Sequence, residues 1–166
     1  IAVRVNADLS NNYGNLIQRI ATFVVKNCSS EINPSNKFNN DDEKIINNFE
    51  KKFKEYFLFM KDLKIDKGIK SIFELLSLIN AYVDNQAPWK LKKTDTIRMY
   101  VVLFLVLNLI IKTTIMLSPI IPNSANKVLK IFNFNKDDIN FDNFTKFINR
   151  KIIVNNPIPI FPRIDE

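Results

Sequence analysis

Three side chains of this sequence are suited to recognising an unpaired nucleic-acid base. Asn15 and Arg19 stand four residues apart in a segment with helical periodicity, so they are neighbours on its polar face. Asparagine offers a donor and an acceptor to a base edge, and arginine binds phosphate or makes paired hydrogen bonds to a base. Trp89, the only tryptophan, directly follows Pro88 and can present a ring for base stacking. Stacking combined with hydrogen bonds to base edges is how single-stranded RNA loops are read, so the three residues predict an RNA-binding role.

Each of these residues also has an ordinary structural explanation. The Asn15–Arg19 pair is compatible with a solvated polar face, and a tryptophan at a helix end is often a packing residue. The net charge of +7 favours an anionic partner such as RNA. However, the heavy use of lysine, isoleucine, asparagine and phenylalanine is also typical of A+T-rich coding DNA. The RNA hypothesis therefore depends on all of these features together.

The composition excludes most enzyme chemistries. The chain has no histidine, so it has no Ser-His-Asp triad, histidine base or histidine zinc site. Its one cysteine, Cys28, excludes an internal disulfide and a multi-cysteine metal site, and nothing near it in the sequence would act as a base. Two glycines in 166 residues exclude a dinucleotide fingerprint and a Walker-type loop. We therefore expect no catalytic residue and no metal site in this chain.

The elements that position these residues are predicted to be helices, because apolar residues recur at intervals of three and four. Helix-forming segments of this kind, with few internal glycines or prolines, indicate an all-α bundle of about five helices. Asp41 or Asp42 is expected to cap the second helix, and Thr94 or Asp95 the fourth. The expected helices cover residues 8–26, 41–63, 67–85, 96–117 and 122–132, with a polar loop at 27–40.

Prolines mark the helix boundaries and the last segment. Ala87-Pro88-Trp89 is expected to break the pattern after the third helix, and Pro122 to open the fifth. A short helical turn near residues 143–147 and an extended segment at 150–154 are expected to follow. The proline-spaced segment 157–163 cannot be helical, and we expect it to lie across the bundle as an extended strap.

The segment Met99–Ile111 is almost entirely apolar, so it fits either a membrane span or a helix buried in a bundle. A span needs about 20 apolar residues. This run contains Asn108 and ends at Lys112, which favours the buried helix.

Four segments resemble signature segments of the anticodon-binding domain of methionyl-tRNA synthetases, in the same order, and they extend over essentially the whole chain. The third also occurs in other class I synthetases, whereas the other three together are more specific to the methionine enzyme. The segments are VNADLSNNYGNLIQR at 5–19, NAYVDNQAPW at 80–89, LSPIIP at 117–122 and FPRI at 161–164.

The resemblance implies a class I synthetase anticodon-binding fold and recognition of the CAU anticodon of methionine tRNA. It implies that Asn15, Arg19 and Trp89 contact the anticodon, with Trp89 stacking on the first base, a cytosine. Asn12, Asn80 and Pro88 are expected to support them.

The resemblance also implies a larger protein around this domain. Residues 1–166 would be the anticodon-binding domain of a cytoplasmic methionine–tRNA ligase, with ATP and Mg used by a catalytic domain that this chain lacks. The expected partners are methionine tRNA and that catalytic domain, with no membrane. Two alternatives stay open. One is the anticodon domain of another class I synthetase, and the other is a helical protein-interaction module without RNA binding.

Overall fold

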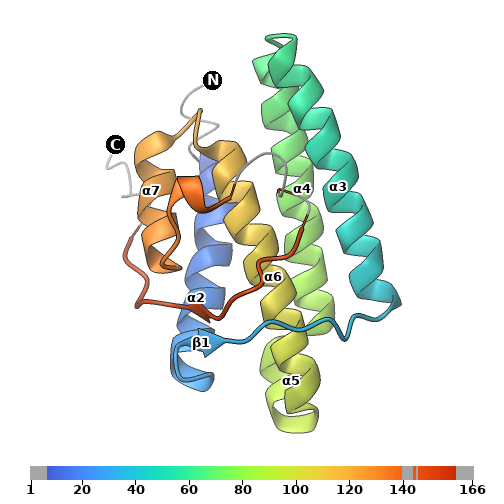
Figure 1. Ribbon diagram of the computed structural model, residues 1–166, viewed down its shortest axis with the longest axis vertical. Helices are drawn as coiled ribbons and strands as arrows, with labels where there is room; N and C mark the ends of the chain where they lie inside the picture. The colour runs from blue at the N-terminus through green and yellow to red at the C-terminus, as the bar shows by residue number, and fades with distance from the viewer. Residues whose placement is uncertain (1–6, 140–143, 145, 160–166) are drawn as a thin grey trace.

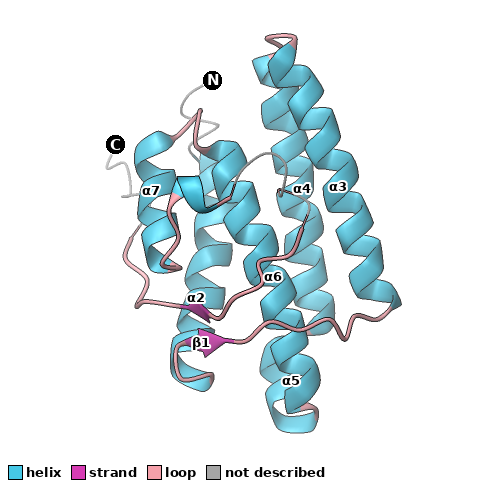
Figure 2. Cartoon of the chain, in the orientation of Figure 1, coloured by secondary structure: helices cyan, strands magenta, loops and turns pink. Residues whose placement is uncertain are grey.

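Helices form most of the described part of the protein in the computed structural model, which describes residues 7–139, 144 and 146–159 (Figure 1). Five helices of ten or more residues occur in these ranges, as the sequence predicts. A small two-stranded sheet is the other regular structure there (Figure 2). The five helices are α2 (Asn15–Asn27), α3 (Asn40–Lys61), α4 (Ile65–Gln86), α6 (Thr96–Leu117) and α7 (Pro122–Ile131).

Helix α6 is the centre of the bundle. It contacts α2, α3, α4 and α7, as well as the short helix α5 (Pro88–Thr94) and strand β1 (Glu31–Ile32). Among the described helices it alone is long and apolar enough to cross a membrane, but 89% of its most apolar stretch is buried inside the bundle. The prediction of a buried core helix is therefore confirmed.

The first helix includes an irregular turn. A π-helical turn, η1 (Leu9–Gly14), runs directly into α2, so the chain is helical from residue 7 to 27. The face that contains Leu16, Ile20 and Val24 is buried against the core. As the amphipathic pattern predicts, Asn15 and Arg19 lie on the opposite, exposed face.

Helices α3 and α4 form a long antiparallel hairpin (Figure 1). The prediction that Asp41 or Asp42 caps α3 is wrong, because the cap is Asn39. Its side chain accepts a hydrogen bond from the backbone N–H of Asp42, and the Asp42 carboxylate accepts one from the backbone N–H of Asn39. Asp42 is thereby the third residue of a capping box, with its carboxylate inside the fold.

The break after α4 occurs where the prolines predict it. Ala87 has a φ of 48°, a left-handed conformation that ends α4, and Pro88 is the first residue of α5. The sequence did not predict α5 as a separate helix. At the next boundary Asp95 caps α6 by accepting a hydrogen bond from the backbone N–H of Arg98 at 3.1 Å, which confirms one of the two predicted caps.

The last part of the chain is extended, as predicted for residues 150–154. Strand β2 (Ile152–Ile153) pairs antiparallel with β1, which lies inside the segment expected to be a polar loop. A short 3-10 turn, η2 (Lys136–Asp138), precedes the helical turn expected near 143–147. Residues 143 and 145 lie outside the described residues. The expected strap is described as far as residue 159, and Phe161, Pro162 and Arg163 lie outside.

A buried lysine ties the segment around residue 147 to the core. Lys112 of α6 is 3% exposed, and its Nζ donates a hydrogen bond to the backbone oxygen of Lys146 at 2.5 Å. The Nζ also lies over the rings of Phe49 and Phe147, 5.9 and 5.4 Å from their centres. Burial lowers the pKa of Lys112 to about 8, because the charged form loses its water.

We expect Lys112→Met to stabilise the fold relative to the unsubstituted chain, and more at pH 7.5 than at pH 9.5. The unfolded chain binds more protons than the folded chain between the lowered pKa and the ordinary lysine pKa, so the unsubstituted chain gains stability as pH rises. The difference in free energy of unfolding between Lys112→Met and the unsubstituted chain should therefore narrow by about 2 kcal/mol from roughly pH 7.5 to roughly pH 9.5. Urea unfolding at both pH values measures it, with the exposed Lys54→Met as the control. An equal pH dependence of the gap in both variants would contradict the assignment to Lys112.

Candidate nucleic-acid interface

Arg19 and Trp89 come together at one end of the bundle, although they are far apart in the sequence. The guanidinium carbon of Arg19 lies 5.1 Å from the centre of the Trp89 ring, which is the geometry of a cation–π contact. Trp89 is 38% exposed, so part of the ring faces solvent. The predicted stacking residue is therefore accessible, and a cation lies beside it.

Asp84 holds the Arg19 side chain in this position. Nη2 of Arg19 donates to Oδ1 of Asp84 at 3.2 Å, and both side chains are largely solvent-exposed. An exposed ion pair of this kind contributes at most about 1 kcal/mol, so a ligand can replace it at small cost. Arg19 is therefore oriented in the free protein without being locked.

A pocket of about 450 Å³ lies beside this pair, between α2 and the start of α5. Its walls are mainly apolar and include Phe23, Pro88 and Trp89, while Arg19 and Lys26 line it with positive charge. Its volume accommodates a planar base, and its combination of apolar surface with a few polar groups is typical of ligand sites.

Of the other predicted site residues, Pro88 lines the pocket, whereas Asn12, Asn15 and Asn80 do not. Asn15 is exposed one helical turn before Arg19. Asn12 is also exposed, and its backbone oxygen accepts a hydrogen bond from Nδ2 of Asn80 at 2.9 Å. Asn80 therefore fixes the π-helical turn from which α2 starts. Pro88 is buried and begins α5, one residue before Trp89.

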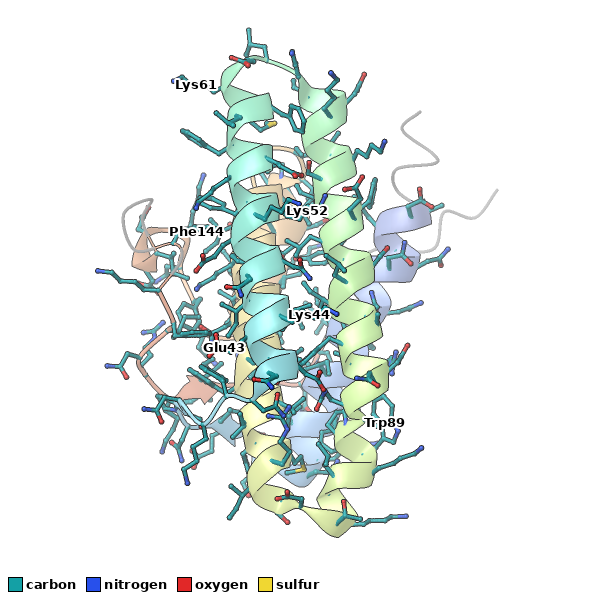
Figure 3. All side chains as sticks on the ribbon, turned by 90° about the vertical axis from the view of Figure 1, so that its right-hand side faces the viewer. Glu43, Lys44, Lys52, Lys61, Trp89 and Phe144 are labelled. Atoms are coloured by element: carbon teal, nitrogen blue, oxygen red, sulfur yellow. The ribbon has the colours of Figure 1, made fainter. Side chains whose placement is uncertain are left out.

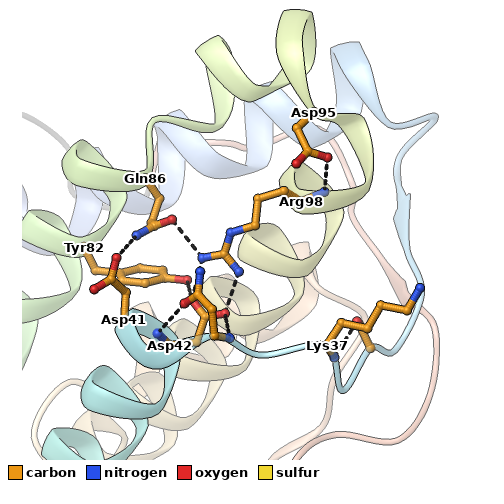
Figure 4. A network of polar contacts seen from close by, with 9 residues as sticks. Lys37, Asp41, Asp42, Tyr82, Gln86, Asp95 and Arg98 are labelled. Carbon is orange, nitrogen blue, oxygen red and sulfur yellow. Dashed lines mark hydrogen bonds and ion pairs between the residues drawn. The ribbon is translucent and has the colours of Figure 1, made fainter.

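A buried polar network fixes the end of α4, two residues before Pro88 (Figure 4). Both terminal nitrogens of Arg98 donate to the Asp42 carboxylate, at 2.6 and 2.7 Å, and the hydroxyl of Tyr82 donates to the same carboxylate at 2.5 Å. Gln86, the last residue of α4, accepts from Arg98 at 2.8 Å. The network thereby joins the first turns of α3 and α6 to the end of α4, where the chain turns toward Trp89.

The network sets the charge states of its members. Burial alone raises the pKa of Asp42, but the hydrogen bonds from Arg98, Tyr82 and the Asn39 backbone together hold it below its ordinary range. Burial and the neighbouring carboxylate raise the pKa of Tyr82. The structure therefore favours an ionised Asp42 between a charged Arg98 and a neutral Tyr82.

The sequence pointed to Trp89 and Arg19 but not to the rest of the pocket around them. Phe23 packs against the core and is only partly buried, because its ring also lines the pocket. The Asp42–Arg98 pair gave no local signal, because the two residues are 56 positions apart. Within the described ranges, no group of three or more acidic or cysteine side chains is placed to hold a metal ion.

The fold and this site together define an all-α domain with an exposed tryptophan–arginine pair above an apolar pocket. The family described as the anticodon binding domain of methionyl tRNA ligase matches residues 32–164. The chain belongs to this family.

Similar proteins extend the match to the rest of the chain. It is 34% identical to a methionine–tRNA ligase of Rickettsia felis over 99% of its own length, and 32% identical to that of Brucella suis over 100%. It spans about a third of the length of these curated relatives. The apo structure of methionyl-tRNA synthetase from Mycobacterium tuberculosis has the same fold, with a TM-score of 0.89, 22% identity, and coverage of 98% of this chain and 34% of that one.

Proposed function

We propose that this domain reads the CAU anticodon of methionine tRNA through the Arg19–Trp89 pocket. The observation that carries the proposal is the partly exposed Trp89 ring, which has a guanidinium beside it and lines a mainly apolar pocket of about 450 Å³. Single-stranded RNA loops are bound by stacking on such rings and by hydrogen bonds to the exposed base edges.

Each proposed contact residue has a separate role. Trp89 stacks on the first anticodon base, which is splayed out of the loop. Arg19, released from the weak pair with Asp84, donates to a base edge or a phosphate. Asn15 offers a donor and an acceptor to a base on the same exposed face. Pro88 and Asn80 support these contacts by fixing the protein backbone at the start of α5 and at η1. Asn12, which is exposed on η1, is the third supporting residue.

We propose further that the domain serves a whole methionine–tRNA ligase, which attaches methionine to its tRNA with ATP and Mg. The relatives of about three times this length carry that name. In this proposal the ATP and Mg site belongs to a catalytic domain, which is the second proposed partner of this chain. A cytoplasmic location follows from the same proposal.

The proposal is tested with two RNA hairpins that differ only in the anticodon. One carries the anticodon stem and loop of methionine tRNA with CAU, and the other carries the same stem and loop with GAU. Fluorescence anisotropy with the chain at physiological salt should show tighter binding of the CAU hairpin. Equal affinity for both hairpins would contradict anticodon reading, and binding to neither would favour a protein-interaction module.

A further inference from the structure

Three lysines flank the Trp89 pocket and have no acidic partner. Lys26 lines the pocket from α2, while Lys90 and Lys93 lie on α5 beside Trp89. All three are exposed, and within residues 7–139, 144 and 146–159 none of them forms an ion pair. We refer to these three side chains as the lysine edge.

No acidic residue along the helix offsets the charge of the lysine edge. No aspartate or glutamate lies three or four positions from Lys26, Lys90 or Lys93 in the sequence, so no pair along the helix offsets their charge. Lys90 and Lys93 are instead three apart on one helix, which makes them like-charged neighbours. Two lysines elsewhere among the described residues do have acidic partners: Lys52 pairs with Glu55 and Glu74, and Lys151 pairs with Glu31.

The lysine edge flanks the Trp89 pocket from both of the helices that form it. Lys93 lies one helical turn after Trp89, so both side chains occupy the same face of α5. Lys26 lies two turns after Arg19 on α2, on the other wall of the pocket. Lys92 lies between the two helices, and its Nζ donates to Oδ1 of Asn27 at 2.5 Å, which holds α5 against the end of α2.

We propose that the lysine edge binds the phosphates on both sides of the base that stacks on Trp89. This inference rests on the proposed function and extends it, because it assigns the sugar–phosphate backbone to residues other than those that read the bases. A base in the pocket carries one phosphate toward α2 and one toward α5, where the lysine edge supplies cations. Such contacts carry no sequence information and position the strand.

The lysine edge predicts a specific change in salt dependence. Each phosphate neutralised on a single strand steepens the slope of log affinity against log salt by about 0.7, so three contacts amount to about two. Replacing Lys26, Lys90 and Lys93 by glutamine should remove that part of the slope for the CAU and GAU hairpins alike. Between about 50 and 200 mM salt, the unsubstituted chain should lose roughly 20-fold more affinity than the variant.

A matched control is available at the other end of the bundle. Lys54, Lys61 and Lys64 are equally exposed and lie near the tip of the α3–α4 hairpin, and Figure 3 shows Lys61 at the opposite end from Trp89. Replacing these three by glutamine changes the net charge by the same amount. We expect a smaller change in slope for this control, because only long-range attraction is lost.

The outcomes separate this inference from the proposed function. Thermal unfolding of both triple variants reports any effect on the fold. A purely structural role of the lysines at α5 would appear as a loss of stability in the first variant. A slope that falls by about two in the first variant, with the CAU preference kept, supports the lysine edge. An unchanged slope, or an equal change in both variants, overturns it. If the unsubstituted chain binds the CAU and GAU hairpins equally well, the proposed function is overturned, and the salt slopes still test the lysine edge.

Discussion

Trp89→Ala is expected to weaken binding of the CAU hairpin by about 5- to 150-fold and to remove most of the preference over GAU. The range follows from the stacking of one base on one aromatic ring, which contributes about 1–3 kcal/mol. The ring also lines the pocket and is the surface on which Arg19 lies, so its loss removes one of the two contacts that orient the guanidinium and leaves only the weak pair with Asp84. Anisotropy titrations of both hairpins measure the two effects separately.

Two further variants make this result specific to the site. Tyr100→Ala removes another aromatic ring of nearly equal exposure, 37% against 38%, that does not line the Trp89 pocket. It should leave both affinities within about twofold of the unsubstituted chain, since a surface change away from the site has little effect. Trp89→Phe keeps a smaller stacking surface and should recover part of the affinity. If Tyr100→Ala weakened binding as much as Trp89→Ala, the assignment of the stacking base to Trp89 would be wrong.

The parts of the fold that depend on local periodicity could be predicted. Helix α6 covers residues 96–117, as Asp95 and the apolar pattern predict, because helix capping and apolar periodicity are local signals. The face of α2 that contains Asn15 and Arg19 is exposed for the same reason. Trp89 and Arg19 are far apart in the sequence, so the sequence indicated each residue but could not predict that their side chains are in contact. The expectation that they act together came from the chemistry of the two side chains, and the resemblance added the anticodon as their ligand.

The parts that failed depend on contacts distant in sequence. Strand β1 lies in a polar segment rich in asparagine and serine, and it is a strand only because β2 pairs with it from far along the chain. Asp42 was expected to be a helix cap because an aspartate at a helix start usually is one. Its partner Arg98 is on another helix, and only the packing of α3 against α4 and α6 brings them together.

The same packing connects stability to the site. The pocket is formed by α2 and α5, and α5 follows α4 after the left-handed Ala87. The direction in which α5 leaves therefore depends on where α4 ends. Gln86 at that end is hydrogen-bonded to Arg98 and to Asp41, so the first turns of α3 and α6 fix it (Figure 4). We infer that the Asp42–Arg98 pair positions Trp89 without contacting RNA.

Asp42→Ala should lower the free energy of unfolding by about 3–5 kcal/mol, which is a large part of the 5–15 kcal/mol typical of a domain. The change removes the acceptor of two Arg98 nitrogens and of the Tyr82 hydroxyl, and it leaves a cation with 16% exposure without its counterion. Asp41→Ala is the matched control. Asp41 is the neighbouring carboxylate, but it is exposed and accepts one hydrogen bond, from Gln86 at 3.2 Å. Its loss should cost no more than about 0.5 kcal/mol in urea unfolding.

The pH dependence and a double variant separate the ion pair from simple loss of packing. Because the folded pKa of Asp42 is below its ordinary value, its contribution is complete above the unfolded pKa of about 3.9 and is lost as pH falls through the folded value. Unfolding of Asp42→Ala should therefore depend less on pH in acid than unfolding of the unsubstituted chain. Adding Arg98→Met removes the unpaired cation and should restore part of the stability, since a buried pair replaced by apolar side chains often costs little. The double variant could instead lose as much free energy of unfolding as Asp42→Ala and Arg98→Met added together. The loss would then come from packing, and the Asp42 carboxylate would not be the group that fixes the end of α4 and so positions Trp89.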